Sequence, residues 1–222
     1  MEFYNEENSV IQGKNITITK TFTRMFLGLA LTAFTSYLTY SSGLFLTIPY
    51  GLLAIIEIAV VLIFSLAFRK LSSTAVTILY FAYAILNGIT MSTIFAVFDM
   101  TSISSAFLIS ALLFGGLALY GYTTDKDMTK FANIFMVGLI IGLIASVINL
   151  FIGSTMIDII LDWVILLIFC GLTAYDMQKM RLISGEVADK EKLYVYFAMQ
   201  LYLDFINLFL RILSITSRRS RK

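Results

Sequence analysis

The feature that most constrains this chain is its last apolar run, from Leu193 to Ile215, which carries a carboxylate near its centre. A run of this length can cross a bilayer as a helix, because a transmembrane helix needs about 20 residues at about 1.5 Å each. A carboxylate at the depth of Asp204 costs at least about 2.5–3.5 kcal/mol on insertion scales. We therefore expect Asp204 to face protein or water rather than lipid.

Four polar residues of this run recur at the spacing of one helix face, i, i+4, i+7 and i+11. They are Gln200, Asp204, Asn207 and Arg211. Tyr, Phe, Leu and Ile fill the opposite side. The pattern predicts a helix inside a bundle whose polar stripe serves a function, with a polar helix contact of no further role as the alternative.

The composition is that of a membrane protein. Of the 222 residues, 59% are hydrophobic and 14% charged, and the mean hydropathy is +0.89. Soluble domains are about 45–50% apolar and about 25% charged. We expect an all-α integral membrane protein in a lipid bilayer. The net charge of +2 does not indicate a nucleic-acid partner, because the basic residues lie in loops and in the tail.

Cysteine and histidine usage excludes several classes of site. The single cysteine, Cys170, lies in an apolar segment, and the chain has no histidine. A disulfide framework within one chain, a zinc centre and every His-dependent nucleophile scheme are therefore excluded. Any pH response near neutrality must come mainly from carboxylates in unusual surroundings. We expect no tightly bound cofactor.

Seven apolar segments predict seven transmembrane helices with short loops. They cover residues 24–40, 44–68, 75–98, 105–122, 131–152, 157–175 and 193–215. We expect a short polar N-terminal tail at 1–23, unlike a cleavable signal peptide, one seven-helix domain at 24–215, and a basic tail at 216–222.

The loop charges predict the orientation. Basic residues occur in the N-terminal segment and in the second, fourth and sixth loops, and none occurs in the first, third and fifth. By the positive-inside rule the N-terminus is cytoplasmic. The basic tail then lies outside, unless the last helix re-enters. The absent signal peptide and the short cytoplasmic loops favour a bacterial inner membrane, with an organelle membrane as the alternative.

The acidic residues sort by depth in this frame. Asp99, Asp158 and Asp162 lie at or near the outer face, although solvation at loop ends explains the first two equally well. On the cytoplasmic side, Asp176 ends the sixth segment and Asp204 lies one to two turns deeper. Arg69, which ends the second span on the same side, completes a predicted cluster of two carboxylates and an arginine. Glu57 lies in the outer half or middle of the second span.

Two stretches carry a family resemblance: AYDMQKM, which contains Asp176, and LYLDFINLFLRIL, which contains Asp204. In them the chain resembles the Bax inhibitor family, also called the transmembrane Bax inhibitor motif proteins, in its bacterial type. The resemblance extends over essentially the whole chain, with seven short-looped spans, a Glu in the second span and a basic pair at its end. It implies a fold in which six helices wrap a central seventh.

The resemblance also implies a function, that of a calcium leak channel whose opening depends on pH. Asp176 and Asp204 would be its di-aspartyl sensor, and Arg69 the latch that bonds Asp176 when the pore is closed, with Lys70 as the adjacent alternative. The residues that we assign to the ion pathway are Glu57, Gln200, Asn207 and Asp162.

The chemistry of two carboxylates supports such a sensor independently. Two carboxyl groups within a few ångströms in a low-dielectric site cannot both ionise cheaply, so they share a proton. We hypothesise that the shared proton and Arg69 hold an inner gate shut. Calcium prefers oxygen ligands, and Asp176 with Asp204 would bind it weakly and transiently, which favours passage over storage. We expect a monomer with possible membrane-protein partners.

Other classes fit less well. In an intramembrane aspartyl protease the Tyr175-Asp176 pair would fit, but Asp204 follows Tyr-Leu instead of Gly-x-Gly, and Pro49 is the sole proline. We therefore expect no enzyme. The last span has no lysine for a retinal Schiff base. A proton-coupled calcium transporter and a non-transporting membrane regulator of stress or cell death remain as alternatives.

Overall fold

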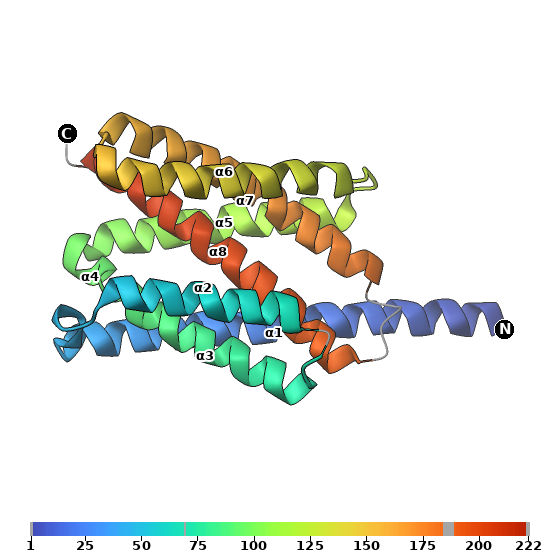
Figure 1. Cartoon of the computed structure of the whole chain (residues 1–222). Coiled ribbons are helices and arrows are strands. Elements are labelled where there is room, and N and C mark those ends of the chain that lie inside the picture. Colours follow the sequence, from blue (N-terminus) through green and yellow to red (C-terminus); the bar gives the residue numbers. More distant parts are fainter. Residues whose placement is uncertain (1, 69, 184–188, 221–222) are drawn as a thin grey trace. The chain divides into compact units, whose positions relative to one another are not determined.

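The computed structural model describes residues 2–68, 70–183 and 189–220, and every regular element in these ranges is helical (Figure 1). The elements are α1 (Glu2–Ser41), η1 (Leu44–Leu46), α2 (Tyr50–Ala67), α3 (Ser73–Met91), α4 (Ile94–Val97), α5 (Met100–Thr123), α6 (Thr129–Ile152), α7 (Thr155–Ile183) and α8 (Lys190–Ser220). The all-helical prediction is confirmed for these residues.

Six helical stretches in the described part of the chain are long and apolar enough to cross a membrane. They are Tyr50–Ala67, Ser73–Val97, Met100–Thr123, Thr129–Ile152, Thr155–Ile183 and Lys190–Arg218. These six correspond to the second to seventh predicted spans. The first, at 24–40, lies inside α1, a Thr-rich helix that is not among the six. Length and composition therefore support six spans, one fewer than we expected.

Glycine and proline determine where α2 begins. Gly43 takes a left-handed conformation, with φ of 74°, which a residue without Cβ adopts without strain. The ring of Pro49 disfavours a helical conformation at Ile48, so the single turn η1 stands apart and the long helix begins at Tyr50. The prediction that the second span begins at Leu44 was therefore too early.

The sixth predicted span ends too soon. We expected it to stop at Asp176, but α7 continues to Ile183, about two turns further. Met177 and Met180 are buried on this extension, so the helix keeps an inward face although its sequence is more polar. At the other end of the chain, α1 begins at Glu2, so the segment predicted as a polar tail continues the helix of the first predicted span.

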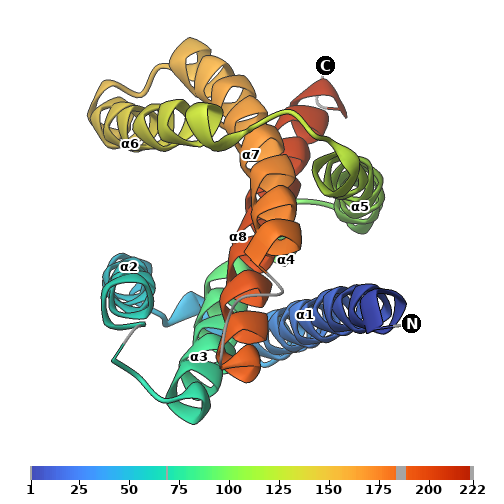
Figure 2. The same cartoon turned by 90° about the vertical axis from the view of Figure 1, so that its right-hand side faces the viewer.

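The chain divides into two compact units. Unit 1 comprises Met1–Asp99 and Leu182–Tyr202, and unit 2 comprises Met100–Arg181 and Leu203–Lys222. In unit 1, α3 lies between α1 and α2 (Figure 2). The first part of α8 belongs to unit 1 and the remainder to unit 2.

In unit 2, α7 lies between α5 and α6 (Figure 2). Glycines permit the close approach: a Cβ on Gly138 would lie 3.1 Å from Ile168, and one on Gly121 would overlap the carbonyl oxygen of Ala174. Small residues at such contacts are typical of helices that pack in lipid.

Helix α8 contributes much of the buried core. Over an apolar stretch of 18 residues in each span, 72% of the residues are buried in α8, against 11% to 44% in the other five. Phe197, Leu201, Leu208 and Leu213 are fully enclosed or nearly so. The last apolar run therefore faces protein over most of its length, as we expected from its carboxylate.

Candidate functional site: a buried pair of carboxyl groups

Asp176 of α7 and Asp204 of α8 both belong to unit 2 and lie close enough for their charges to interact. Their exposed fractions are only 5% and 4%. The long helix α7 brings Asp176 to this position well inside its length, two turns before its end at Ile183. Two carboxyl groups from separate helices thus meet in a site that water barely reaches.

The hydrogen bonding around Asp204 is incomplete. The hydroxyl of Thr173, one turn before Asp176 on α7, contacts the Asp204 carboxyl. That hydroxyl donates its own proton to the carbonyl oxygen of Phe169 at 2.7 Å. Oδ2 of Asp204 has no hydrogen-bond partner among the residues that the structure describes. A buried polar atom left without a partner costs about 1–3 kcal/mol, so this oxygen is suited to hold a proton or a cation.

Among the described residues, Lys179 supplies a positive charge that acts on Asp176, one turn earlier on the same helix. Its Nζ lies 5.7 Å from the centre of the Tyr175 ring. Arg69, the predicted latch, lies outside the described residues. Near this position in the chain, Nζ of Lys192 on α8 donates to the carbonyl oxygen of Leu71 at 2.7 Å and lies 4.9 Å from the centre of the Phe68 ring.

Gln178 attaches the loop between α5 and α6 to α7, close to Asp176 in the chain. Its buried side chain donates from Nε2 to the carbonyl oxygens of Thr124, at 3.2 Å, and Lys126, at 2.8 Å. Its Oε1 accepts a hydrogen bond from the backbone N–H of Met128 at 3.1 Å. One amide therefore satisfies three backbone groups of the loop and fixes it beside the end of α7.

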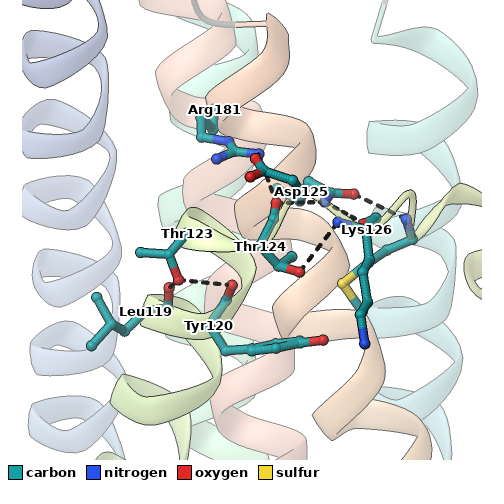
Figure 3. A network of polar contacts seen from close by, with 9 residues as sticks. Leu119, Tyr120, Thr123, Thr124, Asp125, Lys126 and Arg181 are labelled. Carbon is teal, nitrogen blue, oxygen red and sulfur yellow. Dashed lines mark hydrogen bonds and ion pairs between the residues drawn. The ribbon is translucent and has the colours of Figure 1, made fainter.

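Arg181 adds to this attachment (Figure 3). Its Nη2 donates to the carbonyl oxygen of Thr124 at 2.8 Å and lies 3.7 Å from Oδ1 of Asp125. In the same loop, the backbone N–H of Thr129 donates to Asp127 at 2.9 Å, which holds the pKa of that exposed carboxyl below its usual range. The loop is thus ordered by both backbone and side-chain contacts.

Asp162, which we assigned to the ion pathway, is bound by donors from α8 on both of its oxygens. Nη1 of Arg211 donates to Oδ1 at 2.8 Å, and the Ser214 hydroxyl donates to Oδ2 at 2.6 Å. Nη2 of Arg218 lies 3.0 Å from Oδ2. The carboxyl is buried, and its charge is balanced within unit 2. Arg211, which belongs to the predicted polar face of the last helix, therefore pairs with Asp162.

The remaining predicted residues lie in separate surroundings. Glu57, half-buried in unit 1, accepts a hydrogen bond from the hydroxyl of Thr90 at 2.6 Å. Gln200 is half-buried in unit 1, whereas Asn207 belongs to unit 2 and donates to the carbonyl oxygen of Leu203 at 2.8 Å in its own helix. Asp158 is likewise held, because the side-chain amide of Asn149 donates to its Oδ1 at 2.6 Å.

Sequence reasoning missed several of these side chains. Ser214 and Arg218 follow Arg211 at i+3 and i+7, and this spacing placed them on one face of the last helix, a signal that was available. For Gln178 no such signal exists, because its partners are backbone groups more than fifty residues earlier. Within 17–68, 70–183 and 189–218, where the side chains are described, no cluster of three or more acidic or cysteine side chains could hold a metal ion.

Comparison with known proteins gives a consistent result over the whole chain. The family model described as Bax1-I, inhibitor of apoptosis-promoting Bax1, matches residues 14–221. The inner membrane protein YbhL of Escherichia coli strain K12 is 33% identical, with 99% of this chain and 100% of YbhL covered. An uncharacterized membrane protein of Streptococcus pyogenes serotype M3 is 37% identical, with coverage of 93% and 94%. An uncharacterized protein of Borreliella burgdorferi is 34% identical, with coverage of 96% and 97%. The resemblance inferred from the two aspartate motifs is confirmed, and this membrane protein belongs to the Bax inhibitor family.

Proposed function

We propose that this protein is a calcium leak channel whose opening depends on pH, with Asp176 and Asp204 as its proton-sharing sensor. The observation that carries the proposal is the buried pair itself, in which the two charges interact and one oxygen of Asp204 has no partner among the described residues. In such a site a shared proton removes the repulsion between the carboxyl groups. Because the chain has no histidine, carboxyl groups are its natural source of a response near neutrality.

The hydroxyl of Thr173 supports the presence of a proton on the pair. Since this hydroxyl donates to Phe169, its oxygen can act only as an acceptor toward Asp204. A protonated Asp204 supplies the donor that this contact needs. Lys179 is the described cation that acts on Asp176, and we propose that the shared proton resides on Asp204, beside the Thr173 hydroxyl.

Calcium suits the site as a permeant ion rather than as a resident one. It takes six to eight oxygen ligands when tightly bound, and two carboxyl groups supply too few. We retain three residues in the proposed ion pathway, namely Glu57, Gln200 and Asn207. We remove Asp162 from the pathway, because donors from three side chains already occupy its oxygens. We propose no enzymatic activity and no tightly bound cofactor.

The proposed gate retains Arg69 as a latch on Asp176, with Lys70 adjacent, and α8 as the helix around which the others are arranged. The burial of α8 supports this arrangement. We propose a monomer in a bacterial inner membrane with a cytoplasmic N-terminus. The loop charges support that location, and so does the Escherichia coli relative, which is named an inner membrane protein.

The test is calcium flux into dye-loaded proteoliposomes at values between about pH 6 and about pH 8, around neutrality. Raising the pH removes the shared proton and weakens the gate, so we expect the wild-type leak to increase with pH. Asp176→Asn and Asp204→Asn place a permanently neutral amide in the pair and should flatten the profile. The control is Asp125→Asn, the same change on a side chain that is 98% exposed.

Each outcome distinguishes the alternatives. A pH-dependent leak that both pair variants flatten and the control retains supports the sensor. Calcium that moves only when a proton gradient is imposed indicates a proton-coupled transporter instead. No flux at any pH from folded, inserted protein overturns both and favours a non-transporting regulator.

A further inference from the structure

Two arginines of α8 share a single carboxylate in unit 2. Arg211 and Arg218 each form an ion pair with Asp162, which leaves one positive charge in excess. The Asp162 side chain is 4% exposed, whereas those of Arg211 and Arg218 are 31% and 35% exposed. The negative partner is thus enclosed, whereas part of each arginine side chain is exposed.

The donors of these two arginines are not all used. Nε of Arg211 and Nη1 of Arg218 are buried and have no hydrogen-bond partner among the described residues. A charged donor that is removed from water without an acceptor is costly. An anion bound at the exposed part of these side chains would supply acceptors, and rotation of a guanidinium group would bring its unused donor to that anion.

The position of the pair along the helices suggests the source of that anion. Arg218 lies three residues after the end of the apolar run Leu193–Ile215, and the sequence beyond it adds three further basic residues. Trp163, the sole tryptophan, follows Asp162 directly and is 51% exposed. Tryptophan and arginine side chains at the end of a span are typical of the level of lipid headgroups.

We propose that Arg211 and Arg218 bind the phosphate group of an anionic phospholipid, while Asp162 and Ser214 orient the two guanidinium groups. Arginine presents planar paired donors that match phosphate oxygens. The excess positive charge selects a headgroup with a net negative charge over a zwitterionic one, whose choline it repels. The site lies outside the carboxyl pair and does not depend on the proposed channel function.

Trp163 provides a local signal for the test, because all tryptophan fluorescence of the chain comes from this one residue. The purified protein is reconstituted in bilayers that contain either dibrominated phosphatidylglycerol or dibrominated phosphatidylcholine, whose bromines quench nearby tryptophan. The ratio of quenching by the two lipids measures the preference for the anionic headgroup. We expect wild type to favour phosphatidylglycerol, and Arg218→Gln to lower the preference about fivefold.

Two variants make the test specific. Arg218→Lys keeps the charge and should retain most of the preference, so a folded positive control exists if the Gln variant is unstable. Arg181→Gln removes an arginine that lies about 27 Å from Trp163 along α7, and it should leave the lipid preference unchanged. Equal quenching by both lipids in wild type, or an equal loss in Arg218→Gln and Arg181→Gln, overturns the proposal.

A final arm separates lipid from free phosphate. Inorganic phosphate is added to the protein in neutral detergent, with chloride at matched ionic strength as the control. No change in Trp163 fluorescence is expected when the ligand is a headgroup held at the membrane surface. A phosphate-specific change that Arg218→Gln abolishes assigns the site to free phosphate and overturns the lipid assignment.

Discussion

Asp162 illustrates, at the scale of single residues, how strongly the function of a membrane carboxylate depends on its partners. Three donors from α8 occupy its oxygens, at 2.6 Å, 2.8 Å and 3.0 Å. A buried charge with such partners is stable but unavailable to an ion. Asp204 has the opposite environment, with a buried oxygen that has no hydrogen-bond partner among the described residues. Two aspartates of similar burial are therefore suited to different tasks, one to fixing α7 against α8 and the other to titration.

We expect Asp162→Asn to destabilise the protein by about 1–3 kcal/mol, because it leaves charged donors of two arginines without their counter-ion. Thermal unfolding of the purified protein in detergent measures the change. Asp125→Asn is the matched control, since it removes an exposed ion pair worth about 0–1 kcal/mol. Equal unfolding temperatures for the two variants would show that the Asp162 pairs contribute nothing to stability.

At the same scale, the sequence predicted which carboxylates are unusual but not their partners. Asp176 and Asp204 were identifiable because a carboxylate inside an apolar run needs an explanation. The hydrogen bonds to Asp162 could not be identified, because they depend on how two helices about fifty residues apart in the chain are aligned. Helix periodicity predicts on which face of a helix a side chain lies, but it does not predict which residue of the neighbouring helix that side chain contacts.

At the scale of helices, the contact between α5 and α7 depends on one glycine. A Cβ on Gly121 would overlap the backbone of Ala174, two residues before Asp176, whereas a Cβ on Gly116 meets nothing within 4 Å. Backbone atoms cannot move aside as a flexible side chain can. Gly121 and Gly116 of α5 are thus a matched pair, one at a close contact and one in open surroundings.

We expect Gly121→Ala to destabilise the protein by about 1–3 kcal/mol through overpacking. Gly116→Ala should be neutral or stabilising by up to about 1 kcal/mol, because alanine favours a helix over glycine. Thermal unfolding of both variants in the same detergent checks this. Similar losses in both would mean that helix flexibility, and not the contact with α7, is what these glycines provide.

The helices themselves were largely predictable, whereas several of their ends were not. Apolar runs of about 20 residues identified α2, α3 and α5 to α8 in order. The prediction failed where the end of an apolar run was taken as the end of a helix, as at Asp176, because α7 continues with a face that only tertiary contacts bury. The predicted start of α2 was wrong because Pro49 interrupts the helix, which begins only at Tyr50.

At the scale of the whole molecule, the central question is whether α1 crosses the membrane. Its composition is too polar for it to be among the six apolar spans. Yet its second half carries large apolar side chains that are exposed, among them Phe26, Leu27, Phe34 and Leu38. Exposed side chains of this kind over about three turns of a helix are suited to contact with lipid. We therefore infer seven crossings, in agreement with the loop charges.

This inference predicts that the two ends of α1 lie on opposite sides of the membrane. Single cysteines are introduced in a Cys170→Ser background, at Ser9, at Ser42 in the turn after α1, and at Asp125 in the exposed loop between α5 and α6. A membrane-impermeant thiol reagent is then applied to intact and to opened cells. We expect the cysteines at 9 and 125 to react only after opening and the cysteine at 42 to react in intact cells, because seven spans and the positive-inside rule place them so. If positions 9 and 42 react from the same side, α1 does not cross, and the chain has the six spans that its apolar composition supports.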